Sequence, residues 1–117
     1  MGYMLMIVEP RGQRLERTPE EGRAAWDSMT GFAGDLKSRG LLLAAEALKS
    51  DEQGSRVALR GGRSTIADGP FTESKEMIGG FFLLDCKTKE QALAIARECP
   101  AAQWATVEVR ETGTCYE

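Results

Sequence analysis

Residues 68–84 read DGPFTESKEMIGGFFLL. The first part is a turn sequence, because Gly69 tolerates unusual backbone dihedrals and Pro70 fixes its own φ. The last part, Phe81 to Leu84, is an uninterrupted apolar run, which is typical of a strand buried on both faces. The segment therefore predicts a stiff turn that leads into a strand in the protein interior.

A second strand of this kind is predicted near the start of the chain, where Met4 to Val8 is apolar on both alternating faces. A polar, arginine-rich loop follows and runs to Arg17. The next residues, Thr18-Pro19-Glu20-Glu21, combine an N-cap, a proline at the first helical position and a capping box, so they predict the start of a helix. Gly40 is expected to end it. The apolar stripe of this helix comprises Ala25, Trp26, Met29, Phe32, Ala33 and Leu36, and we expect Trp26 and Phe32 to anchor the core.

The middle of the chain is less regular. Leu41-Leu42-Leu43 suits a buried strand, whereas residues 44–48 have helical propensity, and we favour a strand after Gly40. Val57 to Arg60 and Ser64 to Ala67 flank Gly61-Gly62, which predicts a β-hairpin.

The last third of the chain contains one more helix between two strands. Gly80 to Asp85 is expected to be an apolar strand. Thr88 with Gln91 three residues later predicts a helix start, and this helix should run through Glu98 before Pro100 terminates it. The final strand is predicted at Thr106 to Arg110.

This order of elements predicts one α+β domain over residues 1–117, with the split βαβ plan and an inserted hairpin. Two of the predicted strands are apolar on both faces, yet only two long helices are available to cover the sheet. One face of the sheet is thus left uncovered. Because large apolar faces are rarely left in water, a second copy of the chain should pack on it, and we expect a homodimer.

Composition excludes several classes of function. The net charge is −3 and the pI is near 5.1, without a basic stripe, so we expect no nucleic-acid partner. Apolar runs are far shorter than a membrane span requires, and no signal-peptide core is seen, so we expect no membrane partner and a cytoplasmic location. The three cysteines, Cys86, Cys99 and Cys115, are expected to be free thiols, the first two as small buried hydrophobes. The chain has no histidine, which removes imidazole catalysis and most zinc sites.

Candidate functional residues cluster in the turn. Asp68, Glu73, Lys75 and Glu76 place three carboxylates beside one lysine, and such a group can hold one acid at a raised pKa and contact an anion. Each of them alone is also typical of a solvated turn. Phe71 is expected to plug the turn into the core, and no metal or cofactor is expected.

Two further groups of charged residues are weaker candidates. Glu108 and Arg110 alternate with Val107 and Val109, which predicts a polar face of the last strand. In a dimer this face would lie against the partner, so Arg110 joins the candidate ligand contacts. Arg11, Arg14 and Arg17 could bind an anionic ligand, although a solvated loop is the ordinary interpretation.

The stretch from Asp68 to Glu76 resembles the signature DGPF-x-E-x-KE of the DGPF, or YCII-related, family. The likeness extends over nearly the whole chain, through residues 3–6, 79–85, 99–102 and 107–110. The resemblance implies a ferredoxin-like fold in a dimeric α/β barrel. Some relatives look like small-molecule enzymes, including dehalogenases acting on lactones, and others resemble accessory proteins encoded beside alternative sigma factors. The His-Asp pair proposed for some members has no counterpart here, because this chain lacks histidine.

Two hypotheses follow. In the first, Asp68, Phe71, Glu73, Lys75, Glu76 and Arg110 edge a cleft at the dimer that binds a small acidic or lactone-like molecule. Were this cleft catalytic, Asp68 or Glu76 would act as general acid or base, and Lys75 or Arg110 would stabilise developing negative charge. In the second, the chain is a non-catalytic regulatory module that binds a protein partner linked to transcription.

Overall fold

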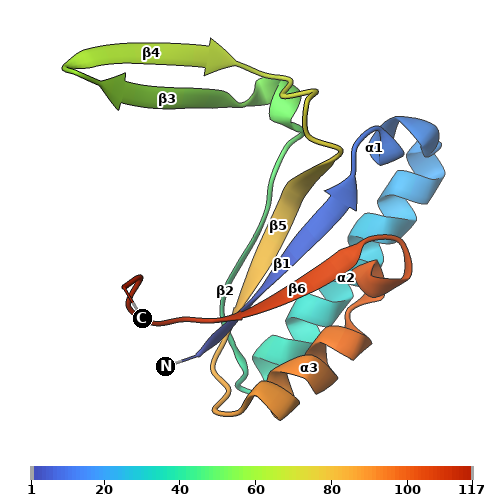
Figure 1. The fold of residues 1–117 in the computed structure, drawn as a ribbon. Coiled ribbons are helices and arrows are strands. Elements are labelled where there is room, and N and C mark those ends of the chain that lie inside the picture. The colour runs from blue at the N-terminus through green and yellow to red at the C-terminus, as the bar shows by residue number, and fades with distance from the viewer. Residues whose placement is uncertain (1, 117) are drawn as a thin grey trace.

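A four-stranded antiparallel sheet forms the centre of the computed structural model, which describes residues 2–116. Two long helices, α2 and α3, cover one face of the sheet, and a separate two-stranded hairpin projects from one end (Figure 1). The elements are β1 (Tyr3–Pro10), α1 (Gln13–Glu16), α2 (Pro19–Ser38), β2 (Leu42–Ala47), the 3-10 turn η1 (Asp51–Gln53), β3 (Ser55–Arg60), β4 (Arg63–Asp68), β5 (Glu76–Leu84), α3 (Lys89–Glu98), η2 (Pro100–Gln103) and β6 (Thr106–Glu111).

The strand order of the sheet is β2-β5-β1-β6, and every neighbouring pair is antiparallel. Strands β1 and β2 are therefore parallel to each other with β5 between them, while β5 and β6 are parallel with β1 between them. Each βαβ unit is thus split by a strand of the other, as the order of elements predicts. The α+β class expected from the sequence is confirmed.

Both long helices begin at the caps that the sequence predicts. The Thr18 hydroxyl accepts a hydrogen bond from the backbone N–H of Glu21 at 3.1 Å, and the Glu21 carboxylate accepts one from the Thr18 N–H at 2.9 Å. These two bonds satisfy backbone donors that the first helical turn otherwise leaves unpaired, and they lower the pKa of Glu21. The Thr88 hydroxyl caps α3 by accepting from the Gln91 N–H at 3.1 Å.

The hydrophobic core lies between the sheet and the two helices. Alternate residues of β1 point toward the helices, so Tyr3, Leu5 and Ile7 are buried and their neighbours in sequence are not. Their partners from other elements include Phe32, Leu36, Phe82, Leu84, Cys86, Ala92, Ile95 and Cys99. Both of these cysteines are free and buried, as expected, and burial raises the pKa of each thiol.

The opposite side of the sheet has no helix over it, and we call it the open face (Figure 1). Cross-strand pairs place its residues together: Met6 lies opposite Phe81 and Glu108, and Met4 lies opposite Leu83. It comprises Met4, Met6, Val8, Ala44, Glu46, Ile78, Phe81, Leu83, Thr106, Glu108 and Arg110. The uncovered, largely apolar face inferred from the count of helices is therefore present in the single chain.

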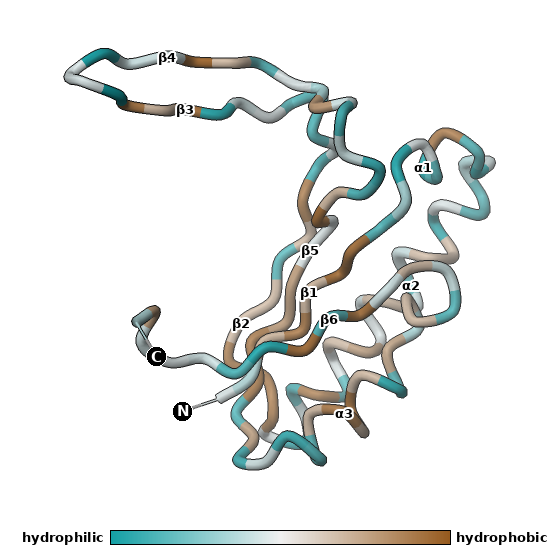
Figure 2. Tube along the Cα trace, viewed as in Figure 1, coloured by the Kyte–Doolittle hydropathy of each residue, from teal (hydrophilic) through white to brown (hydrophobic). Residues whose placement is uncertain are grey.

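The hairpin of β3 and β4, which we call the arm (residues 55–68), extends away from the sheet. Its turn, Gly61-Gly62, has φ values of 56° and 77°, which confirms the predicted glycine link. Val57, Leu59 and Ile66 share one face of the arm and are 70%, 65% and 68% exposed. Figure 2 shows hydrophobic segments along the arm, which stands away from the sheet. The Cα radius of gyration is 16.0 Å, against roughly 13 Å for a compact domain of this size.

Two sequence-based expectations differ from the structure. Strand β5 begins at Glu76 rather than Gly80 and ends at Leu84, because its first residues pair with Pro10, Glu9 and Val8 of the lengthened β1. Trp26 was expected in the core but is 56% exposed, whereas Phe32 on the same helix is buried. Part of the apolar stripe of α2 faces a pocket between this helix, the sheet and η2 instead of the closed core.

Candidate functional site: a clamped turn beside an open cleft

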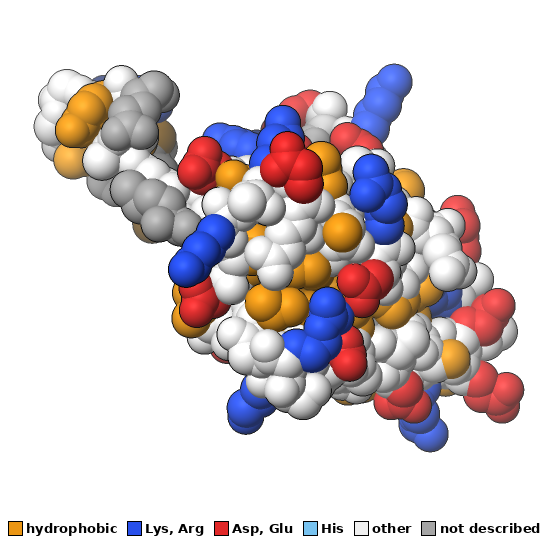
Figure 3. Space-filling view, turned by 90° about the horizontal axis from the view of Figure 1, so that it is seen from below, with side chains coloured by type: hydrophobic (Ala, Val, Ile, Leu, Met, Phe, Trp, Pro, Cys, Tyr) orange, Lys and Arg blue, Asp and Glu red, His pale blue; other side chains and the backbone are white. Residues whose placement is uncertain are grey.

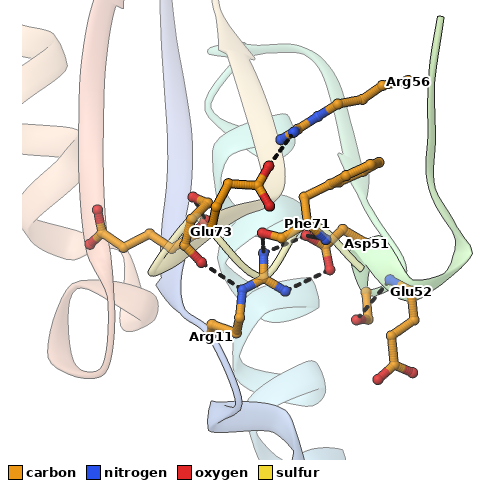
Figure 4. Close-up of polar contacts among 9 residues, drawn as sticks. Arg11, Asp51, Glu52, Arg56, Phe71 and Glu73 are labelled. Atoms are coloured by element: carbon orange, nitrogen blue, oxygen red, sulfur yellow. Dashed lines mark hydrogen bonds and ion pairs between the residues drawn. The ribbon is translucent and has the colours of Figure 1, made fainter. Parts of the chain in front are cut away.

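Arg11 fastens the turn to the rest of the chain (Figure 4). Its Nε donates to the carbonyl oxygen of Ser74 at 2.7 Å, and its Nη2 donates to that of Phe71 at 3.0 Å. The same guanidinium binds the Asp51 carboxylate with both Nη atoms, at 2.8 Å for Nη1–Oδ1. The backbone N–H of Arg11 also donates to the Lys75 carbonyl at 2.9 Å. One side chain at the end of β1 thus joins the turn and η1, which are far apart in sequence.

Asp51 is the second anchor of this clamp. Its Oδ2 accepts from the backbone N–H of Phe71 at 3.4 Å, in addition to the bonds from Arg11. These hydrogen bonds, chiefly the one from Arg11, hold the pKa of Asp51 below its usual range, and the pKa of Arg11 is raised in return. The Arg11–Asp51 pair is mostly shielded from water, so it is a structural ion pair rather than a surface contact.

The aromatic ring of Phe71 lies outside the core and was expected inside it. It is partly exposed, and the guanidinium carbon of Arg56 lies 3.7 Å from the ring centroid. Arg56 Nη1 in turn binds Glu73 Oε1 at 2.8 Å. Hydrogen bonds from the Glu73 backbone N–H and from Arg56 lower the pKa of Glu73. The turn therefore packs against Arg56 at the base of the arm, and its aromatic ring does not enter the hydrophobic core.

A cleft of about 790 Å³ opens between this clamp, the base of the arm and the open face, and we call it the turn cleft. Its lining combines apolar side chains with charges of both signs. The lining residues are Val8, Arg11, Leu48, Lys49, Ser50, Asp51, Gln53, Gly54, Arg56, Phe71, Ser74, Glu76, Met77, Ile78 and Glu108.

Two of the sequence-predicted site residues, Phe71 and Glu76, line the turn cleft. Glu73 is joined to it through Arg56.

The other three candidates lie outside the lining. Asp68 closes the arm, because its Oδ1 accepts from the Ser55 hydroxyl at 2.7 Å. Lys75 contributes its backbone carbonyl to Arg11, and its side chain is exposed. Arg110 pairs with the cleft residue Glu108 at 3.2 Å on the open face.

Sequence reasoning did not find a second group of charged residues, near the same end of β1 but on the inward-facing side of the strand. Glu9 is only 6% exposed, and its two carboxylate oxygens accept from Nη2 and Nε of Arg14 at 2.7 and 2.8 Å. Gly79 leaves room for the Glu9 carboxylate. It is the extra residue of a β-bulge in β5, opposite Ile7 and Val8 of β1, and a Cβ on it would lie 1.8 Å from Glu9 Oε1. The sequence contains one signal for the burial of Glu9, because this residue continues the alternation of inward-facing residues along the first strand.

Charged side chains on one face of the molecule are not segregated by sign (Figure 3). On the face seen from below, basic and acidic side chains of the described residues are interspersed, with apolar side chains between them (Figure 3). Within residues 2–116, no helix combines the length and the apolar character that crossing a membrane requires. Over the same residues, cysteines and carboxylates do not come together in groups of three or more that could hold a metal ion.

Comparison with known proteins gives two findings. The model of the YCII-related domain matches residues 1–112, which is nearly the whole chain. An uncharacterized protein of Rhizobium meliloti (strain 1021) is 42% identical over 45 residues, which make up 38% of this chain and 36% of that protein. The matched part thus spans little more than a third of the relative.

Proposed function

Because the chain belongs to the YCII-related family, we propose that it works as a homodimer that binds a small organic molecule in the turn cleft. The observation that carries this proposal is the position of the cleft: a wall fixed by Arg11 stands directly beside an uncovered apolar sheet face. In a dimeric α/β barrel the second copy would cover that face and supply the remaining wall of the cleft. The site would then be complete only in the dimer.

The apolar surfaces of the single chain support the second copy. Met6 and Phe81 lie at the centre of the open face and are only partly covered. A lone two-stranded hairpin is marginally stable in water, and the apolar face of the arm makes no contact with the core cluster. A partner that packs on the open face and under the arm would bury both surfaces.

A first prediction concerns this assembly. Light scattering or sedimentation at micromolar concentration should give twice the 12.8 kDa of one chain. Met6→Glu should shift the protein to monomers, because it places a carboxylate beside Glu108 in the middle of the open face. The control is Leu15→Glu, an equivalent change at an exposed residue of α1. A clean 12.8 kDa wild-type species would remove the dimer and the shared cleft together.

The chemistry of the cleft favours a small acid or a lactone. Its lining holds three cations and three acids, but Arg11 and Arg56 are already bound by carboxylates, so Lys49 is the cation left to contact an acid. The apolar side chains beside it are Leu48, Phe71, Met77 and Ile78. Of the two predicted acid–base candidates, Asp68 and Glu76, only Glu76 lies in the lining, so it is the group that could exchange a proton with a bound molecule. Asp68 and Lys75 would act through the shape of the turn, and Arg110 through its ion pair with Glu108.

A second prediction tests this binding. In a thermal-shift screen of small carboxylic acids and lactones, a true ligand at a hundredfold excess over its Kd should raise Tm by about 10 °C. Phe71→Leu should abolish the shift, because it removes the aromatic wall and keeps the backbone bonds to Arg11 and Asp51. Arg23→Gln, at an exposed residue that lines neither the turn cleft nor any other pocket described, should leave the shift intact. A shift that Phe71→Leu leaves unchanged would place the ligand elsewhere and refute this site.

A further inference from the structure

The structure has a second pocket, of about 550 Å³, on the helix side of the sheet, and we call it the helix pocket. It lies between α2, η2 and the bulged part of β5. Its walls are apolar and include Trp26 and Met29 of α2 and Trp104 after η2, while the buried pair Gly79-Gly80 forms part of the floor. It shares only Leu48 and Lys49 with the turn cleft.

The polar groups of the helix pocket are predominantly cationic. Arg14, Arg17 and Lys49 line it together with the carboxylate of Glu9, so cations are in excess. Glu46 also lines the pocket, but its register opposite Phe81 places its side chain on the open face. Glu9 is already neutralised by Arg14, since both of its oxygens are bonded to that guanidinium. The bonds use Nε and Nη2, so Nη1 of Arg14 has no hydrogen-bond acceptor among residues 2–116. A donor at the edge of the pocket is therefore left for another acceptor.

Arg17 is the second available cation. Its guanidinium carbon lies 5.5 Å from the centroid of the Trp104 ring, and its one hydrogen bond within the described chain is a long one, 3.4 Å to the Gln13 side chain. The Gln13 side chain also donates to the backbone carbonyl of Trp104 at 2.6 Å, which joins the chain after η2 to α1. Arg17 is thus positioned by an aromatic ring rather than by a carboxylate, and it forms no ion pair with a described residue.

From these contacts we propose that the helix pocket binds a small monoanion with an aromatic or branched apolar body. Its carboxylate accepts from Arg17 and from Nη1 of Arg14, and its body lies between Trp26, Met29 and Trp104. The excess of positive charge favours an anion, and guanidinium groups bind carboxylates with well-directed hydrogen bonds. The exposed position of Trp26 has a use in this arrangement, because its ring forms part of the binding wall. This inference is independent of the turn cleft.

Intrinsic fluorescence provides a direct test, because the only two tryptophans of the chain, Trp26 and Trp104, both line the helix pocket. Titration of the full chain with phenylacetate or benzoate should change the tryptophan emission in a saturable way. Phenylacetamide, which has the same body without the charge, should bind at least about tenfold more weakly. Inorganic phosphate, which has charge without an apolar body, should give no saturable change.

Variants assign the signal to the pocket. Arg17→Gln should weaken phenylacetate binding about tenfold or more, while Arg17→Lys should recover part of the affinity. Arg23→Gln removes an arginine from the exposed surface of α2 and should bind as the wild type does. Circular dichroism checks that each variant is folded, and Trp26→Phe keeps the test usable through the emission of Trp104.

Equal binding of the acid and the amide, or unchanged affinity in Arg17→Gln, would overturn the proposal. Phe71→Leu should not alter this binding, which separates it from the turn cleft.

Discussion

Gly69→Ala should destabilise the protein by about 3 kcal/mol, the upper end of the range for overpacking. A Cβ on this residue would lie 1.8 Å from the backbone carbonyl oxygen of Asp51, and backbone cannot move aside as a flexible side chain can. The Gly69 N–H also donates to the Gly54 carbonyl at 2.8 Å, so relief of the clash would separate the turn from η1. The whole clamp around Arg11 depends on this close approach.

Urea unfolding at a fixed protein concentration measures the effect as a shift of the midpoint with an unchanged slope. The matched control is Gly34→Ala in α2, where a Cβ meets nothing within 4 Å. Because glycine weakens a helix interior, this control should gain about 0.5–1 kcal/mol. If Gly69→Ala unfolds at the wild-type midpoint, the contact between the turn and η1 is not as described.

The second large effect is expected from Arg14→Met, which leaves the Glu9 carboxylate buried without its partner. Removing one member of a buried ion pair typically costs 3–5 kcal/mol. About a third of the Arg14 side chain is exposed, so we expect a loss of about 2–3 kcal/mol, below that range. Urea unfolding near neutral pH measures this difference.

A double variant separates the cause from simple loss of packing. Arg14→Met combined with Glu9→Gln replaces the unpaired charge by a neutral amide and should recover part of the lost stability. Arg23→Met removes an exposed arginine and should stay within about 0.5 kcal/mol of the wild type. The burial argument fails if Arg14→Met costs no more than Arg23→Met does.

Local signals in the sequence were sufficient for most elements. Thr18 with Glu21 and Thr88 with Gln91 fixed both helix starts, because capping depends on residues three positions apart. The glycine pair of the arm predicted the hairpin for a similar reason, since the positive φ values that it needs depend only on the residues of the turn itself. Counting helices against apolar strands was also sufficient to identify the open face.

The site was harder to predict, because its contacts join residues that are distant in sequence. Arg11 and Asp51 are 40 positions apart, and neither lies in the DGPF stretch from which the turn is predicted. The clamp depends on where η1 lies, and nothing in its short sequence indicates that position. Trp26 shows a different limit. Helical spacing placed it on the apolar stripe correctly, but periodicity cannot show whether the space between a helix and its sheet is filled or left as a pocket.

The strand order of the sheet also limits when the chain can fold during its synthesis. Within residues 2–116, β1 pairs with β5 and β6 and β2 pairs with β5, so residues 2–75 contain no partner for either strand. While the ribosome is still making the first half, the apolar residues of β1 have no sheet to join. Completion of β5 supplies the missing central strand, and we expect the nascent chain to remain without its sheet until residue 84 has left the exit tunnel.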